Sequence, residues 1–242
     1  MKTHSNSNII TLGRGYGVEI LNAVKKAEKS VKIVSPYLSS NYLDELVDLH
    51  KKGVNITLIT SDNLTEPNTK YSFDDSKVIK QEKVELQGDE EKKKHLKKYA
   101  NSFFIASIFI CLFSLLLHSL LYLAILSLLI SAFFFFHEMF IKKYTYKYST
   151  IFRLKVFDSH SGKKPQSTSL IHSKIFLIDN KICFLGSANF TYSGFQTHYE
   201  TVIKVEDLKS IKDINEEVEK LFESNELDAK DIQKWGREIY ER

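Results

Sequence analysis

The 242-residue sequence contains only two cysteines, Cys111 and Cys183, which are too few for a disulfide framework. Cys111 falls in an apolar run and Cys183 in a predicted strand, so we expect a reducing compartment. The N-terminal residues MKTHSNSN lack the apolar core of a secretory signal. The net charge of +4 is small and by itself implies no charged partner. No internal repeat recurs at the period of a solenoid.

Charge is missing from the middle of the chain, because residues 102–136 contain no Asp, Glu, Lys or Arg. One helix of this length would measure about 52 Å, whereas the hydrocarbon core of a bilayer is about 30 Å thick. We therefore predict a transmembrane helical hairpin with two spans, about 102–117 and 120–136, that turns near His118-Ser119. A re-entrant hairpin is an open alternative, and a buried helix pair in a soluble protein is the third interpretation.

Positive charge flanks this run on both sides. The flanking lysines are Lys92, Lys93, Lys94, Lys97 and Lys98 before it, and Lys142, Lys143 and Lys147 after it. Lysines mark the cytoplasmic side of a membrane segment, so both ends of the run are expected in the cytoplasm. This predicts a multi-pass protein of the cell membrane with its catalytic domain on the cytoplasmic side. Four tyrosines are expected at the level of the lipid headgroups: Tyr99, Tyr144, Tyr146 and Tyr148.

The rest of the chain alternates helix and strand patterns. Helical spacing near Ile20–Ala27 and Leu43–Val47 alternates with β-branched strands at 31–37 and 54–60, which predicts an α/β layer structure. Later strands are predicted at 151–157 and 199–207, and apolar helical faces at 211–222 and 232–239. The expected division is a first half of the α/β domain at 1–80, a charged juxtamembrane segment at 81–101, the hairpin at 102–136, the second half of the domain at 137–207, and C-terminal helices at 208–242.

The stretch IHSKIFLIDNKICFLGSAN, residues 171–189, carries the chemistry. It reads mostly as buried strand, yet it contains an imidazole and an ammonium. Side chains two apart on a strand point the same way, so His172 and Lys174 are expected on one side, with Ile175 and Leu177 on the other.

Three further polar groups follow this pair. A tight turn at Gly186 can bring the Ser187 hydroxyl and the Asn189 amide back beside the imidazole of His172, and Glu200 falls on the next predicted strand. These residue types do not have zinc-site spacing, so we expect no metal and no cofactor. Together they suit an oxyanion with several exposed oxygens, such as a phosphate diester.

The pattern H-x-K-x4-D-x6-G-S-x-N, from His172 to Asn189, resembles the HKD motif of the phospholipase D superfamily with every spacing intact. Glu200 is similar to a downstream acidic position of compact single-motif members. Residues 23–60 resemble the helix–strand–helix–strand unit that opens those domains. The resemblance implies a phospholipase D-like α/β/α sandwich with a mixed central sheet, which the membrane hairpin interrupts.

The resemblance also implies roles for the matching residues. His172 would attack phosphorus, while Lys174 and Asn189 would hold the non-bridging oxygens. Ser187 would assist by hydrogen bonding, and Glu200 would fix the tautomer of a histidine. Asp179 belongs to the motif but looks more structural, since Asp-Asn-Lys suits a turn. The candidate catalytic residues are His172, Lys174, Asp179, Ser187, Asn189 and Glu200.

The chain carries only one complete motif. His-x-Lys recurs at His50 and His95, but neither copy is followed by the Asp or by Gly-Ser-x-Asn. The chemistry needs a second proton-transfer group for the leaving alkoxide and the attacking water. Single-motif relatives supply it by dimerising, so we predict a C2 homodimer in which two copies of His172 share one site.

Four functions fit this sequence. The favoured one is a membrane-anchored phosphodiesterase that hydrolyses or transfers phospholipid headgroups through a phosphohistidine. The alternatives are a membrane-tethered nuclease acting on DNA or RNA, a phosphatidyltransferase like the cardiolipin synthases, and a non-catalytic scaffold. The sequence shows no dense basic stripe with interleaved aromatics, which disfavours nucleic acid.

Several further residues keep two interpretations. Gly13–Gly17 is a plain turn or a phosphate cradle, and His198 is incidental or a second polar group at the site. Lys163 and Lys164 either contact an anionic substrate or lie in a solvated loop.

Overall fold

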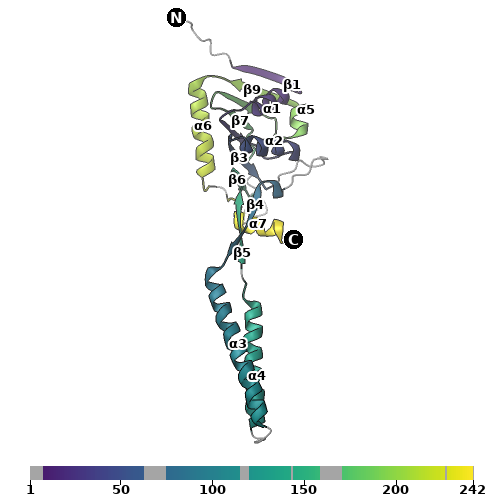
Figure 1. Cartoon of the computed structure of the whole chain (residues 1–242). Helices are drawn as coiled ribbons and strands as arrows, with labels where there is room; N and C mark the ends of the chain where they lie inside the picture. The colour runs from purple at the N-terminus through teal and green to yellow at the C-terminus, as the bar shows by residue number, and fades with distance from the viewer. Residues whose placement is uncertain are drawn as a thin grey trace. The chain divides into compact units, whose positions relative to one another are not determined.

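The computed structural model describes residues 8–62, 75–114, 120–142, 144–158, 171–226 and 228–241 (Figure 1). The chain forms two compact units, one made of Met1–Gln81 with Tyr148–Arg242 and the other of Glu82–Lys147. The second unit is thus an insertion into the first.

The first unit is built on a seven-stranded sheet with the order β1-β9-β8-β7-β2-β3-β6. Its strands are β1 (Ile9–Arg14), β2 (Ser30–Val34), β3 (Asn55–Ser61), β6 (Arg153–Phe157), β7 (Ile175–Ile178), β8 (Ile182–Gly186) and β9 (Tyr199–Val205). The β2–β3 and β3–β6 pairs are parallel, and the remaining neighbours are antiparallel. The predicted α/β fold with a mixed central sheet is confirmed.

Helices cover both faces of this sheet. They are α1 (Gly17–Lys25), α2 (Ser40–Lys51), α5 (Tyr192–Gln196), α6 (Leu208–Glu223) and α7 (Ile232–Tyr240), with a 3-10 turn, η1, at Asp75–Lys77. Neighbouring residues of β7 point to opposite faces. Phe176 packs in the cluster that contains Phe195 of α5, whereas Leu177 packs with Ile211 of α6.

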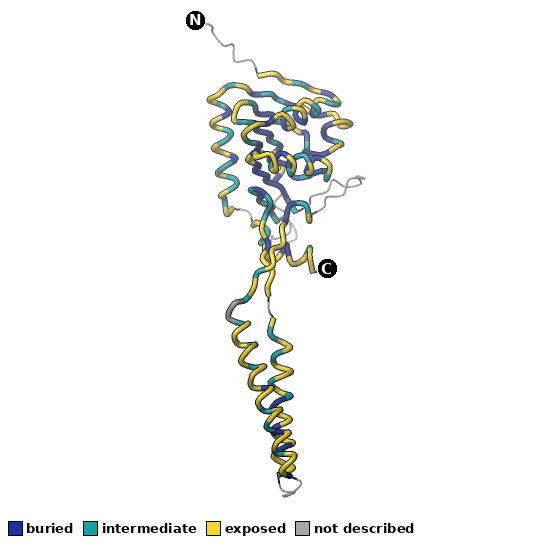
Figure 2. The backbone as a smooth tube through the Cα atoms, in the orientation of Figure 1, coloured by how far each residue is buried: buried dark blue, intermediate teal, exposed yellow. Residues whose placement is uncertain are grey.

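The central strands are buried on both faces, as Figure 2 shows. Phe176 and Leu177 are 1% and 0% exposed. Burial of each such side chain stabilises the fold by about 1.5–3 kcal/mol. The layers therefore hold β7 and β8, which carry the motif, in a fixed position.

Some limits of the strands and helices agree with the sequence predictions, and others differ. The strand predicted at 31–37 ends at Val34, because Pro36 lacks an N–H for the ladder. Helix α2 ends as predicted, with Gly53 in the left-handed region at φ 93°. Strand β1 was not predicted. Its residues are mostly exposed, and Ile10 and Leu12 are 68% and 69% exposed, so its pattern does not alternate cleanly.

The second unit contains two long helices, α3 (Gln87–Ser114) and α4 (Leu120–Phe140). They pack antiparallel: Ser127 Oγ donates to the carbonyl of Phe103 and Ser131 Oγ donates to that of Ala100, both at 2.8 Å. Small residues let two helices approach closely. The buried residues of this pair are all small: Ala100, Ser107 and Ser114 on α3, and Ala124, Ser127 and Ser131 on α4.

The outer surface of the helix pair is apolar. Phe109, Leu129 and Phe133 are 59%, 62% and 65% exposed. Both helices are long and apolar enough to cross a membrane, by length and composition. The turn predicted near His118-Ser119 lies outside the described residues.

The structure changes the predicted limits of this region. The apolar run begins at residue 102, but α3 begins at Gln87, so most of the predicted juxtamembrane segment 81–101 is the first part of the same helix. Helix α4 continues past 136 to Phe140. A two-stranded sheet of β4 (Ile79–Glu85) and β5 (Tyr144–Thr150), which was not predicted, flanks the helices in sequence.

The headgroup position predicted for Tyr148 is wrong. This residue is 3% exposed, and its ring stacks on Tyr240 within the first unit. Its hydroxyl also accepts a hydrogen bond from Gln81 Nε2 at 3.2 Å. Tyr148 therefore belongs to the core of the first unit, whereas Tyr144 and Tyr146 are 42% and 40% exposed.

Candidate active site

The motif residues come together at one edge of the sheet. The antiparallel register pairs Ile175 at the start of β7 with Leu185 near the end of β8. The next pair joins Gly186, at the end of β8, to Val202 on β9. The segment before β7, the turn after β8 and the start of β9 therefore meet at this edge. His172 and Lys174 lie in the extended segment before β7 rather than within a strand.

His172 and Lys174 are in direct contact, which confirms that they share a side. Lys174 Nζ lies 3.1 Å from His172 Nδ1 and donates to the His172 carbonyl at 2.7 Å. The Lys174 side chain is buried, while His172 is exposed. Burial lowers the pKa of Lys174, and the nearby Glu200 carboxylate only partly opposes this effect.

Glu200 is the buried carboxylate of the site, with 8% exposure. Ser187 Oγ donates a hydrogen bond to Glu200 Oε2, and the Thr201 N–H donates to Ser187 Oγ at 3.0 Å. His198 Nδ1 lies 3.7 Å from Glu200 Oε1. The histidine beside Glu200 in this chain is thus His198, which the sequence left between an incidental and a functional position.

The glycine before Ser187 is required by the close approach of two strands. A Cβ on Gly186 would overlap the carbonyl oxygen of Thr201 on β9. That oxygen also accepts from the Ser187 N–H at 3.0 Å. Only glycine lets β8 end this close to β9, and this contact places the Ser187 hydroxyl on Glu200.

Asn189 presents a polar group that is not satisfied. Its Oδ1 is buried and has no hydrogen-bond partner among the described residues. Its main chain is held in place, since the Thr191 N–H donates to its carbonyl at 2.7 Å. A buried amide with one unpaired end costs free energy unless a ligand or water pairs with it. Since Oδ1 is an acceptor, only the NH2 group of Asn189 could donate to a phosphate oxygen.

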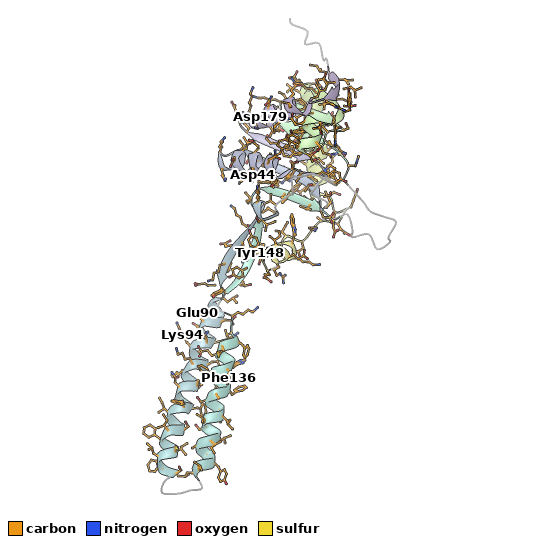
Figure 3. The ribbon with its side chains drawn as sticks, turned by 90° about the vertical axis from the view of Figure 1, so that its right-hand side faces the viewer. Asp44, Glu90, Lys94, Phe136, Tyr148 and Asp179 are labelled. Carbon is orange, nitrogen blue, oxygen red and sulfur yellow. The ribbon has the colours of Figure 1, made fainter. Side chains whose placement is uncertain are left out.

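Asp179 occupies a different place, at the turn between β7 and β8 (Figure 3). Asp179 and Asn180 both have positive φ, 53° and 52°. The Asp179 carboxylate accepts from the N–H groups of Glu28, Lys29 and Ser30 at 3.1, 2.7 and 2.9 Å. Burial alone would raise the pKa of Asp179, but these hydrogen bonds outweigh it and lower the pKa below its usual value.

The position of Asp179 separates it from the other motif residues. The four residues of β7 lie between Lys174 and Asp179, so the two are five residue steps apart, or about 17 Å at 3.3 Å per residue. The carboxylate ties the loop before β2 to the β7–β8 turn. This is the structural placement that the resemblance implied for Asp179, at the opposite end of β7.

Tyr16 was missed by the sequence analysis. Gly13 on β1 pairs directly with Glu200 on β9, so a Cβ on Gly13 would point to the same side as the Glu200 side chain. That Cβ would lie 2.7 Å from Cε2 of Tyr16. The Tyr16 ring, which is 41% exposed, therefore lies over β1 on the same side as Glu200.

The Gly13–Gly17 segment thus forms a turn that positions side chains. Gly15 has φ 77°, which makes the turn between β1 and α1. Arg14 stacks on Tyr199 with 5.1 Å from its Cζ to the ring centroid. Only the strand register reveals that these residues lie beside Glu200, so no local sequence signal could have found them.

No group of three or more His, Cys, Asp and Glu side chains within the described part of the chain could hold a metal ion. Lys163 and Lys164 lie outside the described residues.

Comparison with known families places the chain in a class of phosphodiester-processing proteins. The family model described as "Cardiolipin synthase, PLD-like domain" matches residues 20–113 and 136–224. The chain therefore belongs to the phospholipase D superfamily, whose members are phosphodiesterases and phosphotransferases. No curated protein matches the sequence.

Solved structures with a similar fold include two whose chains are covered almost completely by the match. NucT from Helicobacter pylori is 15% identical with a TM-score of 0.49, covering 90% of this chain and 96% of that one. Nuc from Salmonella typhimurium, a phospholipase D family member, is 12% identical with a TM-score of 0.44, covering 93% and 99%. The phosphatidylserine synthase of Haemophilus influenzae Rd KW20 is 12% identical with a TM-score of 0.43, covering 95% and 41%. None of these similarities identifies a substrate.

Proposed function

We propose that the protein is a membrane-anchored phosphodiesterase that hydrolyses or transfers a phospholipid headgroup through a phosphohistidine on His172. One observation carries this proposal above the others: the buried ammonium of Lys174 lies 3.1 Å from the imidazole of His172 in a chain of the phospholipase D superfamily. A nucleophile beside a partly desolvated cation suits attack on a phosphate, because the cation stabilises the charge that develops on the phosphate oxygens.

The contact between Lys174 and His172 determines which step must come before attack on phosphorus. The ammonium of Lys174 donates to Nδ1 of His172, so a neutral ring carries its proton on Nε2 in this arrangement. Attack by Nε2 requires the other tautomer, with the proton on Nδ1. Lys174 must therefore release Nδ1 as its ammonium turns to the phosphate oxygens. Substrate binding is then coupled to activation of the nucleophile.

The reaction has two substitutions. In the first, His172 forms a bond to phosphorus, the bond to the leaving alkoxide breaks, and an acid gives the alkoxide a proton. In the second, water attacks phosphorus, the bond to His172 breaks, and a base takes the proton of the water. An alcohol in place of water gives transfer. Lys174 and the amide of Asn189 hold the phosphate oxygens throughout.

The acid and base would come from a second copy of the chain. The chain carries one HKD motif, so a C2 homodimer would place the His172 of each copy against the same phosphate. His198 is the alternative proton carrier within one chain, since its Nδ1 is 3.7 Å from Glu200. Mixing wild-type chains with His172→Asn chains distinguishes a site shared by two copies from proton transfer by His198 within one chain.

The apolar helices α3 and α4 would anchor the enzyme. Lysines flank the uncharged run, with Lys98 before it on α3 and Lys142 after it, which favours two crossings with the catalytic unit in the cytoplasm. Protease treatment of sealed vesicles tests this topology. Digestion of the catalytic unit only in vesicles that expose the cytoplasmic side would support it, and protection there would contradict it.

Two substrate assays test the proposed function. The purified chain is offered phospholipid vesicles and, separately, single-stranded DNA, each with a His172→Ala control. Release of headgroup that the control lacks supports the proposal. Cleavage of DNA alone would replace it with the membrane-tethered nuclease. Turnover of neither substrate would favour a non-catalytic scaffold on this fold.

A further inference from the structure

An open groove runs between α3 and α4 in the second unit. Its cavity volume is about 270 Å³. Phe104 of α3 and Leu128, Phe135 and Phe136 of α4 line it. The three phenylalanines are 50%, 54% and 58% exposed. The groove therefore offers apolar walls to a ligand of apolar character.

One polar group opens into this apolar surface. Asn101 is exposed and lines the groove. The hydroxyl of Ser131, which also lines it, is already used by the carbonyl of Ala100 at 2.8 Å. An amide at the border of a hydrocarbon region loses free energy unless it finds a hydrogen-bond partner. A ligand that fits here should carry a polar end next to an apolar chain.

A cation lies beside the amide on the same stripe of the helix. Lys97 precedes Asn101 by four residues and Phe104 by seven, so the three side chains share one face of α3. The Lys93 ammonium on this face is taken by Glu138, at 3.9 Å. Within the described chain, Lys97 has no acidic partner within 4.0 Å, so its charge is available to a ligand.

We propose that this groove is a binding site for an anionic phospholipid, separate from the phosphodiester site. An acyl chain lies against Phe104 and Phe136, and the headgroup phosphate contacts Lys97 and Asn101 (Figure 3 shows Phe136 on α4 and, one turn before Lys97 on α3, Lys94). A zwitterionic lipid fits less well, because its own ammonium lies next to the phosphate and meets the lysine. The inference rests on the proposed membrane anchoring.

The test uses the full chain with His172→Ala, so that turnover cannot alter the lipids. The protein is reconstituted in nanodiscs that contain equal amounts of phosphatidylglycerol and phosphatidylcholine, and is then extracted from them. Mass spectrometry measures the lipid that stays bound to the extracted protein. We expect enrichment of phosphatidylglycerol, a drop of about fivefold with Lys97→Gln, which is the effect of one lysine at an anionic surface, and a further loss with Asn101→Leu.

Lys92→Gln is the matched control. It removes the same charge five residues earlier, where the side chain points about 140° away from Lys97 around the helix. Lys92 is 73% exposed and pairs with Asp89 at 3.4 Å. An equal loss of phosphatidylglycerol in the Lys92 and Lys97 variants would overturn the groove site in favour of general surface charge, and so would equal retention of both lipids.

Vesicle flotation of the same protein separates this inference from the proposed function. A chain that does not float with vesicles contradicts both the anchor and the groove. A chain that floats but retains the two lipids equally contradicts the groove alone. Headgroup release by the wild-type chain tests the proposed function and is measured independently of flotation and of lipid retention.

Discussion

The ammonium nitrogen of Lys174 lies 3.1 Å from Nδ1 of His172, and the same ammonium donates to the His172 carbonyl at 2.7 Å. The cation is thus held at the nucleophile before any substrate arrives. Since the lysine is 6% exposed, its position is set by the protein and not by solvent. This relationship gives the first two predictions.

Lys174→Met should lower kcat/KM by about 10²–10³, because the phosphate oxygens lose their main cation in the transition state. The fold should remain, since the change removes a buried charge and keeps an apolar stem. Lys181→Met, on the exposed turn after Asp179, is the control and should have less than a twofold effect. Kinetics on headgroup release and circular dichroism check both statements. Wild-type activity in Lys174→Met would remove this residue from the mechanism.

The pH profile should show the lowered pKa of Lys174. The ammonium form is needed to hold the phosphate, and burial makes it lose its proton at a lower pH than an ordinary lysine, whose pKa is 10.5. Activity should therefore fall on the alkaline side at a pH below 10.5. Lys174→Arg keeps its charge and should lose this alkaline limb. An unchanged limb in Lys174→Arg would assign the titration to another group.

Asp179→Asn should reduce stability and leave the chemistry intact. The carboxylate accepts three main-chain hydrogen bonds, and loss of its charge should cost about 1–2 kcal/mol, which lowers the melting temperature by roughly 2–8 °C. The folded pKa is lowered, so this stabilisation is present above the ordinary value of 3.8 and disappears as the pH falls through the folded value.

Asp48→Asn is the control for Asp179→Asn. Asp48 is 62% exposed and pairs with Lys51 of its own helix at 3.0 Å, so the melting temperature of this variant should hardly change. Thermal unfolding at pH 7 and pH 3 measures the difference between the two variants. A loss of kcat greater than 100-fold in folded Asp179→Asn would give the residue a catalytic role.

Gly13→Ala should disturb the site through Tyr16. The added Cβ would lie 2.7 Å from Cε2 of Tyr16, so the ring must move from its place beside Glu200. We expect a severalfold rise in KM for the diester, as in Tyr16→Ala, with a smaller effect in Tyr16→Phe. Gly13 also has φ 156°, which disfavours any side chain, so the added Cβ should lower the melting temperature with or without the Tyr16 ring. The KM of the double variant Gly13→Ala/Tyr16→Ala should still equal that of Tyr16→Ala. Additive effects on KM in the double variant would show that Gly13 acts through something other than the Tyr16 ring.

Mixed dimers test the shared site. Wild type and His172→Asn chains are co-expressed with different tags, and the mixed species is isolated. A shared site needs both histidines, so the mixed dimer should have far less than half of the wild-type activity per dimer. If it keeps half or more, the second proton carrier lies within each chain, and His198→Gln should then remove activity.

The motif strand and the layers around it were predictable because short stretches of sequence carry their patterns. Phe176 and Leu177 are buried on opposite faces, and the spacing from His172 to Asn189 is carried by one short stretch. Strand β1 was not predicted, because its apolar residues are adjacent and exposed. The β4–β5 pair was not predicted either, because β4 is mostly charged and the alternating tyrosines of β5 were interpreted as headgroup contacts. Tyr16 depends on the pairing of Gly13 with Glu200, 187 positions apart, which no local pattern records.

The sequence also could not identify which residues contact each polar side chain of the candidate site. The prediction that Glu200 contacts a histidine did not say which one, and the structure places His198 at 3.7 Å. That distinction depends on how the side chains of β9 and the turn after β8 meet. Helix α3 offers a similar case: the charged run before residue 102 suggested a solvated helix apart from the predicted span, whereas one continuous helix runs from Gln87 to Ser114.

The central claim is that His172 attacks phosphorus, and trapping the intermediate tests it most directly. A diester labelled on its phosphoryl group is mixed with wild type, quenched in alkali, in which phosphohistidine survives, and the peptides are mapped by mass spectrometry. The account predicts a phosphoryl adduct on His172 that is lost in acid and absent from His172→Ala. Turnover of the diester by His172→Ala, or an adduct on any other residue, would contradict it.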